Sequence, residues 1–384
     1  MEVHELSFYS QFKCTMGACP NTCCRGWQIV FDDGTARKYK EAPGLSGIRL
    51  RSAITRRNGM TMFRRRRGFC PFFTKERTCG VQQTLGEDYM PEVCRIFPRQ
   101  RVNYGDFAEE TLFLACPEAA RLFLRNRNAL CLRTVKRPVS YARLGTNEDS
   151  GFLRELILLR EMLIERTKDT RASLAAISAE LLTFAGRLQQ HYIRQAGAQA
   201  GLSDAGEASA LPLPKLRDCI GNAGPDFIIP AGTAHRMVTG GFYHIFLKKT
   251  APFLYRMCRM YFSEYGRLTE SQAQTHADRL RAALHAGFPE ADAILRGHLA
   301  YYLLLEFLSA YENYSFVRII AAGIMHTQLL ELFLALYWQS TKSLSEEEII
   351  QIIAALDRRG RHCAEVEAAM FEELSPFLRG WIEG

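Results

Sequence analysis

The sequence of 384 residues lacks any run of about 18 uninterrupted apolar residues, which is the least that a membrane-spanning helix needs. Its most apolar stretches, residues 299–308 and 329–338, are interrupted by Glu306 and Glu331. The first residues include two glutamates and lack the apolar core of a signal peptide. We therefore expect a cytoplasmic protein with reduced thiols that does not bind a membrane, in which both apolar stretches form buried helices.

The sequence also lacks a Gly-x-Gly-x-x-Gly motif at the end of a strand, and it shows no alternation of strands with helices. These absences exclude a nucleotide-binding site of the Rossmann type. A nucleotide-containing cofactor would have to bind in another way.

Cysteine, by contrast, is abundant and unevenly distributed. Of the twelve cysteines, eight lie in the first third of the chain and four are scattered over the rest. The eight are Cys14, Cys19, Cys23, Cys24, Cys70, Cys79, Cys94 and Cys116. A single cysteine is often only a small buried side chain, and secreted chains use such sets for disulfides. In a reducing compartment this density favours a metal centre, and all eight are candidate ligands.

The spacing of these thiols matches none of the common metal motifs. It lacks the paired Cys-x2-Cys knuckles of a zinc ribbon, the ferredoxin run, and the Cys-x3-Cys-x2-Cys of radical enzymes that cleave S-adenosylmethionine (SAM). A metal centre needs about four protein ligands. Cys19, Cys79 and Cys94 are the best candidates because they stand singly in motif loops. One of Cys23 and Cys24 is expected to join them, since neighbouring side chains on an extended backbone point to opposite sides.

Basic residues are concentrated in one segment. Residues 44–78 contain ten Lys and Arg residues against one acid, Glu76, and so account for the formal net charge of +8. The run from Arg64 to Arg67 lies at the centre of this segment. Such a cluster is either a solvated loop or a docking surface for an acidic protein or nucleic acid.

The sequence predicts a mainly α-helical fold in two domains. Residues 1–130 are rich in Gly, Pro, Cys and aromatic residues, which predicts an irregular, cysteine-rich, metal-binding domain. Within it we expect a short strand at residues 28–31 and a helix over residues 111–124, with Pro117 near its first turn. Residues 131–384 are expected to form an all-helical domain, because apolar residues recur there at helical spacing.

The helical domain is predicted in more detail. Its first helix begins near residue 150, and the others cover residues 172–190, 241–261, 270–286, 289–311, 315–338 and 345–357. Thr269 is the expected N-cap and Gly287 the expected C-cap of one of these helices. Residues 196–214 are rich in Ala, Gly and Ser, which predicts a flexible stretch.

Several motifs in the first third of the chain together resemble the flagellin lysine N-methylase family. They are Phe12-Lys-Cys14, Cys19-Pro-Asn-Thr-Cys-Cys24-Arg-Gly-Trp27, Asp32, Cys70-Pro-Phe, Cys79, Leu85-Gly-Glu87, Cys94-Arg-Ile-Phe-Pro-Arg99 and Cys116-Pro-Glu-Ala-Ala-Arg121. The segment also resembles, more distantly, small cysteine-rich domains that chelate zinc or iron. The helical remainder is similar to the family only in size and character.

This resemblance implies methylation of lysine side chains on flagellin, with SAM as the methyl donor and a [4Fe–4S] cluster in the cysteine-rich domain. A cluster held by three cysteines would leave one iron open to bind the amino and carboxylate groups of SAM. The lysine amine must lose its proton before it attacks the sulfonium methyl group. That step requires a base or a desolvated pocket.

Four residues are candidates for roles in this chemistry. Asp32 and Glu118 are the carboxylates nearest the motifs and are candidate catalytic bases, although such residues more often cap turns and helices. Arg95 and Arg99 belong to the motif of Cys94 and are candidates for binding the SAM carboxylate or for compensating thiolate charge. Pairing with nearby acids is the alternative for both arginines.

A function of another class is the alternative reading of the same residues. In it the thiols bind structural zinc and the arginines dock an acidic partner or nucleic acid, without catalysis. Flagellin is the partner that the methylase interpretation implies, and nucleic acid is not expected there.

Overall fold

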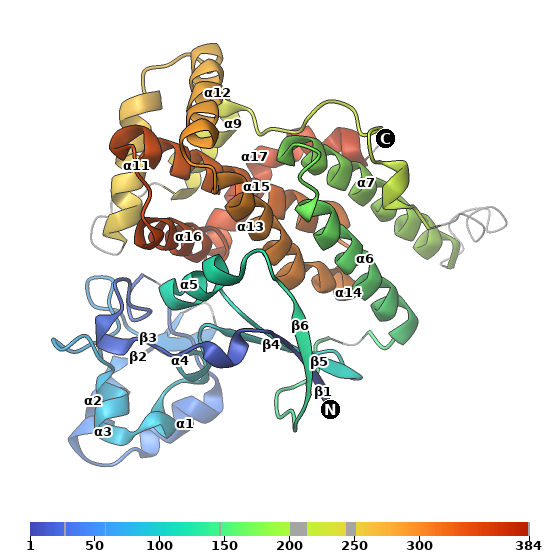
Figure 1. Ribbon diagram of the computed structural model, residues 1–384. Helices are drawn as coiled ribbons and strands as arrows, with labels where there is room; N and C mark the ends of the chain where they lie inside the picture. Colours follow the sequence, from blue (N-terminus) through green and yellow to red (C-terminus); the bar gives the residue numbers. More distant parts are fainter. Residues whose placement is uncertain (27, 58, 146, 200–212, 243–250, 383–384) are drawn as a thin grey trace.

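The architecture comes from a computed structural model, which describes residues 1–26, 28–57, 59–145, 147–199, 213–242 and 251–382. Most helices gather in one large body, a small sheet lies against this body, and the cysteine-rich segment lies to one side of the sheet (Figure 1). The predicted mainly α-helical fold is confirmed. The two residue ranges proposed as domains stay predictions.

A four-stranded mixed sheet, which the sequence analysis did not predict, joins the N-terminus to residues 99–136. Its strands are β1 (Glu2–Leu6), β4 (Arg99–Asn103), β5 (Phe107–Leu112) and β6 (Leu132–Lys136), in the order β4-β5-β1-β6. β1 runs parallel to β5, with Glu2 opposite Phe107, and the two outer pairs are antiparallel. The sheet therefore depends on pairing between segments far apart in the sequence.

β5 also corrects the predicted helix over residues 111–124. Thr111 lies in this strand, and the helix begins only at Pro117, as α5 (Pro117–Asn126). All six residues of β5 are buried, so the strand lacks the apolar–polar alternation of a half-exposed strand. Pro117 does occupy the first turn of the helix, as predicted.

The cysteine-rich segment contains short elements between its loops. They are α1 (Asp33–Glu41), α2 (Gly44–Ala53), β2 (Ile54–Arg57), β3 (Met60–Phe63), α3 (Gly80–Leu85) and α4 (Glu92–Ile96), with 3-10 turns at η1 (Tyr9–Gln11), η2 (Met16–Ala18) and η3 (Glu87–Tyr89). β2 and β3 form a separate hairpin. Residues 28–31, predicted as a strand, form a single bridge to β3 through Val30 and Met62.

The helical part agrees closely with the predicted helices. Its elements are α6 (Ser150–Lys168), α7 (Leu174–Gln199), η4 (Leu216–Asp218), α9 (Ala231–Arg236), the π-helical turn η5 (Met237–Phe242), α11 (Pro252–Tyr265), α12 (Glu270–Gly287), α13 (Ala291–Glu306), η6 (Phe307–Ser309), α14 (Ala310–Asn313), α15 (Phe316–Thr341), α16 (Glu346–Gly360) and α17 (Ala364–Ile382). Thr269 caps α12 in a capping box with Gln272, as its position predicted. The range predicted as all-helical, residues 131–384, also contains the strand β6, which pairs with β1. From residue 150 onward, the described residues contain no strand.

Some helix boundaries differ from the prediction. The helix expected from residue 241 begins at Pro252, whose ring suits a first turn, and residues 243–250 lie outside the described part. Gly287 is the last residue of α12, and Phe288 takes the C-cap position. Residues 196–199 continue α7, while residues 200–212 of the predicted flexible stretch lie outside the described residues. α17, which has Pro376 inside it, was not predicted.

The longest apolar helix is part of the core. Among the described helices, only α15 is long and apolar enough to cross a membrane by length and composition, and 94% of its most apolar window is buried inside the protein. This burial confirms the interpretation of residues 329–338 as a core helix. α15 packs against α7, α12, α13 and α16.

Two buried histidines beside this core make stability dependent on pH. Burial lowers the pKa of His298 to about 4 and that of His326 to about 3, with Arg361 adding to the lowering and Asp357 opposing it. An unfolded histidine titrates at about 6.5, so below that pH the unfolded chain binds more protons than the folded one. We expect the free energy of unfolding to be greatest above this value and to fall as the pH drops from about 6.5 toward 4. Urea titrations across this pH range should show that the free energy of unfolding falls less steeply with decreasing pH in His326→Gln. The same pH dependence in the variant would contradict a role of His326 in it.

Candidate metal centre

Two loops and a short helix bring the thiols of the cysteine-rich segment toward one another. The backbone N–H of Cys70 donates to the carbonyl of Cys24 at 2.8 Å, which ties the second loop to the first. Cys79 forms a bridge with Phe73, so the chain returns to the same place after the intervening turn. Cys94 lies on α4, and all three segments pack on a small core that includes Phe63 and Phe72.

Four of these thiols are electrostatic neighbours, and we call Cys23, Cys70, Cys79 and Cys94 the thiol quartet. Burial raises the pKa of Cys70 to about 12, with the charges of Cys79 and Cys23 adding to the shift. Burial also raises the pKa of Cys94 well above its ordinary value, with contributions from the other three members. Burial and the neighbouring thiolate charges therefore disfavour ionisation of Cys70 and Cys94 unless a cation compensates the charge.

Cys23 and Cys24 are arranged differently from the sequence-based expectation. They lie in a turn and hydrogen-bond to each other, and this bond and burial together raise the pKa of Cys23. The expectation assumed an extended backbone that would send their side chains to opposite sides. Both therefore face the same region, and Cys24 packs on the same small core as Cys79 and Cys94.

Cys19 and Cys116 lie beside Cys23 on the side of the quartet that faces the helical part. Burial raises the pKa of Cys116 to about 12, and the charges of Cys19 and Cys23 add to this effect. Burial is also the main cause that raises the pKa of Cys19. Cys14 is exposed, and its sulfur accepts a hydrogen bond from the N–H of Met16 at 3.4 Å. The structure thus brings Cys70 into the central group and leaves Cys14 at the surface.

The donor set fits a thiophilic metal in chemistry, although its geometry is not that of a formed metal site. No group of three or more His, Cys, Asp or Glu side chains in the described part of the chain is arranged to hold a metal ion. No disulfide joins any of the twelve cysteines. Thiolates are the preferred ligands of zinc and of iron–sulfur clusters, and a bound cation would remove the mutual repulsion of the quartet. The quartet is therefore the candidate centre.

Arg358 at the end of α16 connects the helical part to this centre. Its guanidinium donates to Asn21 Oδ1 at 3.2 Å, to the Asn21 carbonyl at 3.1 Å and to the Thr22 carbonyl at 3.1 Å. It also donates to the carbonyl of Ala115 at 2.9 Å, directly before Cys116. One side chain therefore fastens two cysteine-bearing segments, and the sequence around it gave no motif by which to find it.

Replacing Arg358 with alanine is expected to loosen the centre. Outer-shell partners of this kind affect metal affinity by about 10- to 100-fold, so we expect a loss of that order in bound metal. Arg358→Lys should recover little of it, because an ammonium group keeps the charge but cannot bridge both segments with a planar fork. Metal analysis and hydrogen exchange at Asn21 and Thr22 measure the effect, with Arg359→Ala as the neighbouring control. Full metal content and unchanged exchange in Arg358→Ala would contradict the bridging role.

The predicted catalytic carboxylates have structural contacts. Asp32 is the exposed N-cap of α1 and accepts a hydrogen bond from the N–H of Thr35 at 2.5 Å, which lowers the pKa of its carboxyl. Glu118 lies in the first turn of α5 and pairs with Arg121 at 3.2 Å. Asp32 thus has the capping role that the sequence analysis named as the alternative, whereas Glu118 forms an ion pair within its own helix. Catalysis by either residue stays a prediction.

The two predicted cofactor-binding arginines lie in different surroundings. Arg95 is exposed on α4, and its charge acts on Tyr39 together with the charges of Cys94, Cys79 and Cys70. Arg99 begins β4 and lies over the ring of Phe12, 5.0 Å from its centroid. Arg95 is therefore the one nearer to the quartet. Trp27, which belongs to the first motif, lies outside the described residues.

The described elements define a mainly α-helical protein with a small mixed sheet and a cysteine-rich segment that gathers thiols. No model of a known protein family matches the chain. No solved structure matches it either.

Curated relatives give its family. The flagellar biosynthetic protein FliU of Salmonella muenchen is 32% identical over 137 residues, which cover 34% of this chain and 81% of the relative. Two lysine-N-methylases, from Salmonella typhimurium and Salmonella choleraesuis, are each 31% identical over 137 residues. The chain belongs to the flagellin lysine N-methylase family. The match spans about a third of the length of the two methylases, 34% of each.

Proposed function

We propose that this protein transfers methyl groups from SAM to lysine side chains of flagellin, and that its thiol quartet holds an iron–sulfur cluster. The proposal is supported by the relatives named as lysine-N-methylases and as a flagellar biosynthetic protein. The observation that carries it is the gathering of Cys23, Cys70, Cys79 and Cys94 from two loops and the short helix α4. Ordinary packing does not call for four neighbouring thiols, of which Cys70 is buried and the other three are partly buried.

Three members of the quartet would hold the cluster, with the fourth and Cys24, Cys19 and Cys116 beside it. When bound, a [4Fe–4S] cluster with three cysteine ligands would supply an iron that can take up the amino and carboxylate groups of SAM. The protein's own part is to keep water away and to balance charge. Tyr39, which is fully buried and donates to the carbonyl of Tyr89 at 2.8 Å, would shield one side of the site from water. Arg358 would offset thiolate charge on the other side.

The transfer itself forms a bond between the lysine nitrogen and the methyl carbon and breaks the bond from that carbon to sulfur. The products are methyl-lysine, S-adenosylhomocysteine and a proton. Because an ammonium group has no free electron pair, the lysine must arrive deprotonated or lose its proton in the site. A desolvated site would lower the pKa of a lysine that enters it and so favour the neutral amine.

Mass spectrometry of flagellin tests this function. Purified flagellin is incubated with SAM and the anaerobically purified protein, and added masses on lysine-containing peptides are expected. A brown protein with iron and sulfide supports the cluster, whereas a colourless protein with stoichiometric zinc favours the alternative of a non-catalytic adaptor. An unchanged flagellin mass with the cluster intact would exclude the proposed methylation.

A further inference from the structure

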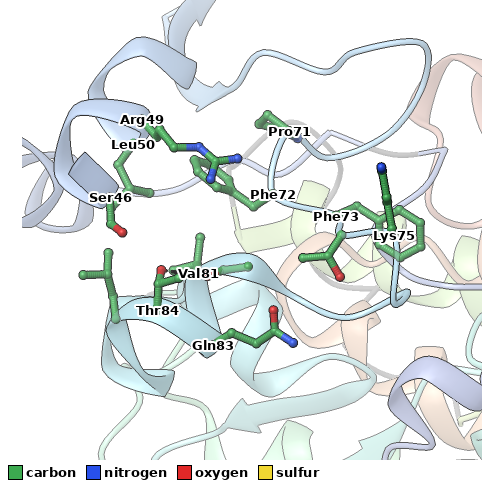
Figure 2. Close-up of a pocket in the computed structure, with 13 residues that line it drawn as sticks. Ser46, Arg49, Leu50, Pro71, Phe72, Phe73, Lys75, Val81, Gln83 and Thr84 are labelled. Atoms are coloured by element: carbon green, nitrogen blue, oxygen red, sulfur yellow. Dashed lines mark hydrogen bonds between the residues drawn. The ribbon is translucent and has the colours of Figure 1, made fainter.

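A cavity of about 350 Å³ lies between α2, α3 and the loop that follows Cys70. Figure 2 shows Arg49, Leu50 and Phe72 on one side of it and Val81, Gln83 and Thr84 on the other. Leu50, Phe72 and Val81 are buried and form an apolar floor. The walls share their backbone with the quartet, because Pro71 directly follows Cys70 and Gly80 directly follows Cys79.

The cavity is positively charged and has no acidic side chain in its lining. Arg49 and Lys75 reach it from opposite walls and are exposed (Figure 2). Within the described residues neither of them forms an ion pair. Two cations without a partner beside an apolar floor fit a ligand that carries a carboxylate next to an apolar group.

SAM does not fit this charge pattern. It has one carboxylate, but its ammonium and sulfonium groups make its net charge positive at neutral pH. A cavity with two cations and no acid would repel it. The cavity is thus a poor match for the methyl donor.

The surface around the cavity favours a protein ligand. On α2, beside Arg49, the side chains of Leu45 and Ile48 are 80% and 55% exposed. Large apolar side chains next to unpartnered cations are typical of a protein interface and less so of a nucleic-acid site, where aromatic side chains stack on bases.

We propose that the cavity between α2 and α3 docks an acidic side chain of the protein substrate, while Leu45 and Ile48 contact an apolar residue beside it. This inference rests on the proposed function, since it concerns the way flagellin is held. A segment bound there lies next to the loops of Cys70 and Cys79, which brings its neighbouring lysine toward the thiol quartet.

A charge reversal tests the docking site. In Arg49→Glu/Lys75→Glu the attraction becomes repulsion, and we expect the KM for flagellin to rise by about 10-fold with little change in kcat. Arg154→Glu/Lys215→Glu reverses two exposed cations outside the cavity and should leave KM unchanged. Direct binding of flagellin monomers without SAM, measured at low and at added salt, should weaken only in the first variant.

The outcomes separate docking from catalysis. A flagellin variant with basic residues in place of the docking acids should restore binding to Arg49→Glu/Lys75→Glu, which no folding defect would allow. Normal methylation with an unchanged KM in that variant overturns the docking site but leaves the methylase function standing. If flagellin binds through the cavity but the unaltered protein does not methylate it, the proposed methylase function is overturned and the docking site stands. Binding of a DNA or RNA oligonucleotide through Arg49 and Lys75 in preference to flagellin would also overturn the inference.

Discussion

Cys70→Ser and Cys94→Ser are expected to lose their bound metal, together with any visible absorbance and methyl transfer. Each removes a thiolate from the centre of the quartet, where a serine hydroxyl is a poor replacement because it stays protonated. Loss of even an outer-shell partner lowers metal affinity by about 10- to 100-fold, so loss of a ligand should cost at least that much. Iron, sulfide and zinc analysis of anaerobically purified protein measures the effect.

The choice of cysteines makes this prediction specific. Cys14 and Cys131 are exposed, so Cys14→Ser and Cys131→Ser are matched controls and should keep full metal content. Cys19→Ser should keep most of its metal, because the structure places Cys70 among the four central thiols and Cys19 beside Arg358. Loss of metal in Cys19→Ser but not in Cys70→Ser would favour the ligand set expected from the sequence. Circular dichroism of each variant establishes that its helices have formed.

The second large effect is expected at a buried ion pair between the sheet and the helices. Arg160 on α6 donates to both carboxylate oxygens of Glu109 on β5, at 2.8 and 2.6 Å, and to the carbonyl of Leu304 on α13 at 3.2 Å. Arg160 is 3% exposed and Glu109 is 5% exposed. Removing one member leaves a buried charge without compensation, which costs about 3–5 kcal/mol.

We therefore expect Arg160→Leu to lower the free energy of unfolding by that amount and to shift the urea midpoint strongly. Arg160→Leu/Glu109→Leu should recover much of the loss, because no charge is then left buried. Arg171→Ala is the control, since Arg171 pairs with Asp169 at the surface, where such pairs contribute about 0–1 kcal/mol. Equal losses in the single and double variants would show that packing, and not the uncompensated charge, dominates at this position.

The helices were predictable because their signals are local. The apolar spacing of α6 and α16, the Thr269 cap of α12 and Pro117 at the start of α5 all operate within a few residues of one another. A helix boundary differed from the prediction where a proline occupies the first turn, as Pro252 does in α11. The buried character of α15 also followed from composition, since a glutamate interrupts its apolar run.

The sheet was not predictable in the same way. β1 and β5 pair in parallel although a long segment separates them in the sequence. The buried strand β5 contains Glu109 and Glu110, and from the sequence alone such charged residues are expected at the surface. Only the partners explain them, because Arg160 compensates Glu109 and Arg137 pairs with Glu110 at 2.6 Å. Tertiary pairing overrides local preference in such strands.

The sequence alone determined that this protein is mainly helical and that its first third carries a set of thiols, since periodicity and composition are properties of the chain itself. Its motifs also pointed to the family that the relatives support. The tertiary structure decided which thiols meet, because Cys23, Cys70, Cys79 and Cys94 come from separate segments that pack on one small core. It also decided that Arg358, more than two hundred residues away in the sequence, fastens the loop of Cys23 to the segment before Cys116. Contacts between residues far apart in the sequence depend on how the segments pack in space, so the spacing of residues along the chain does not predict them.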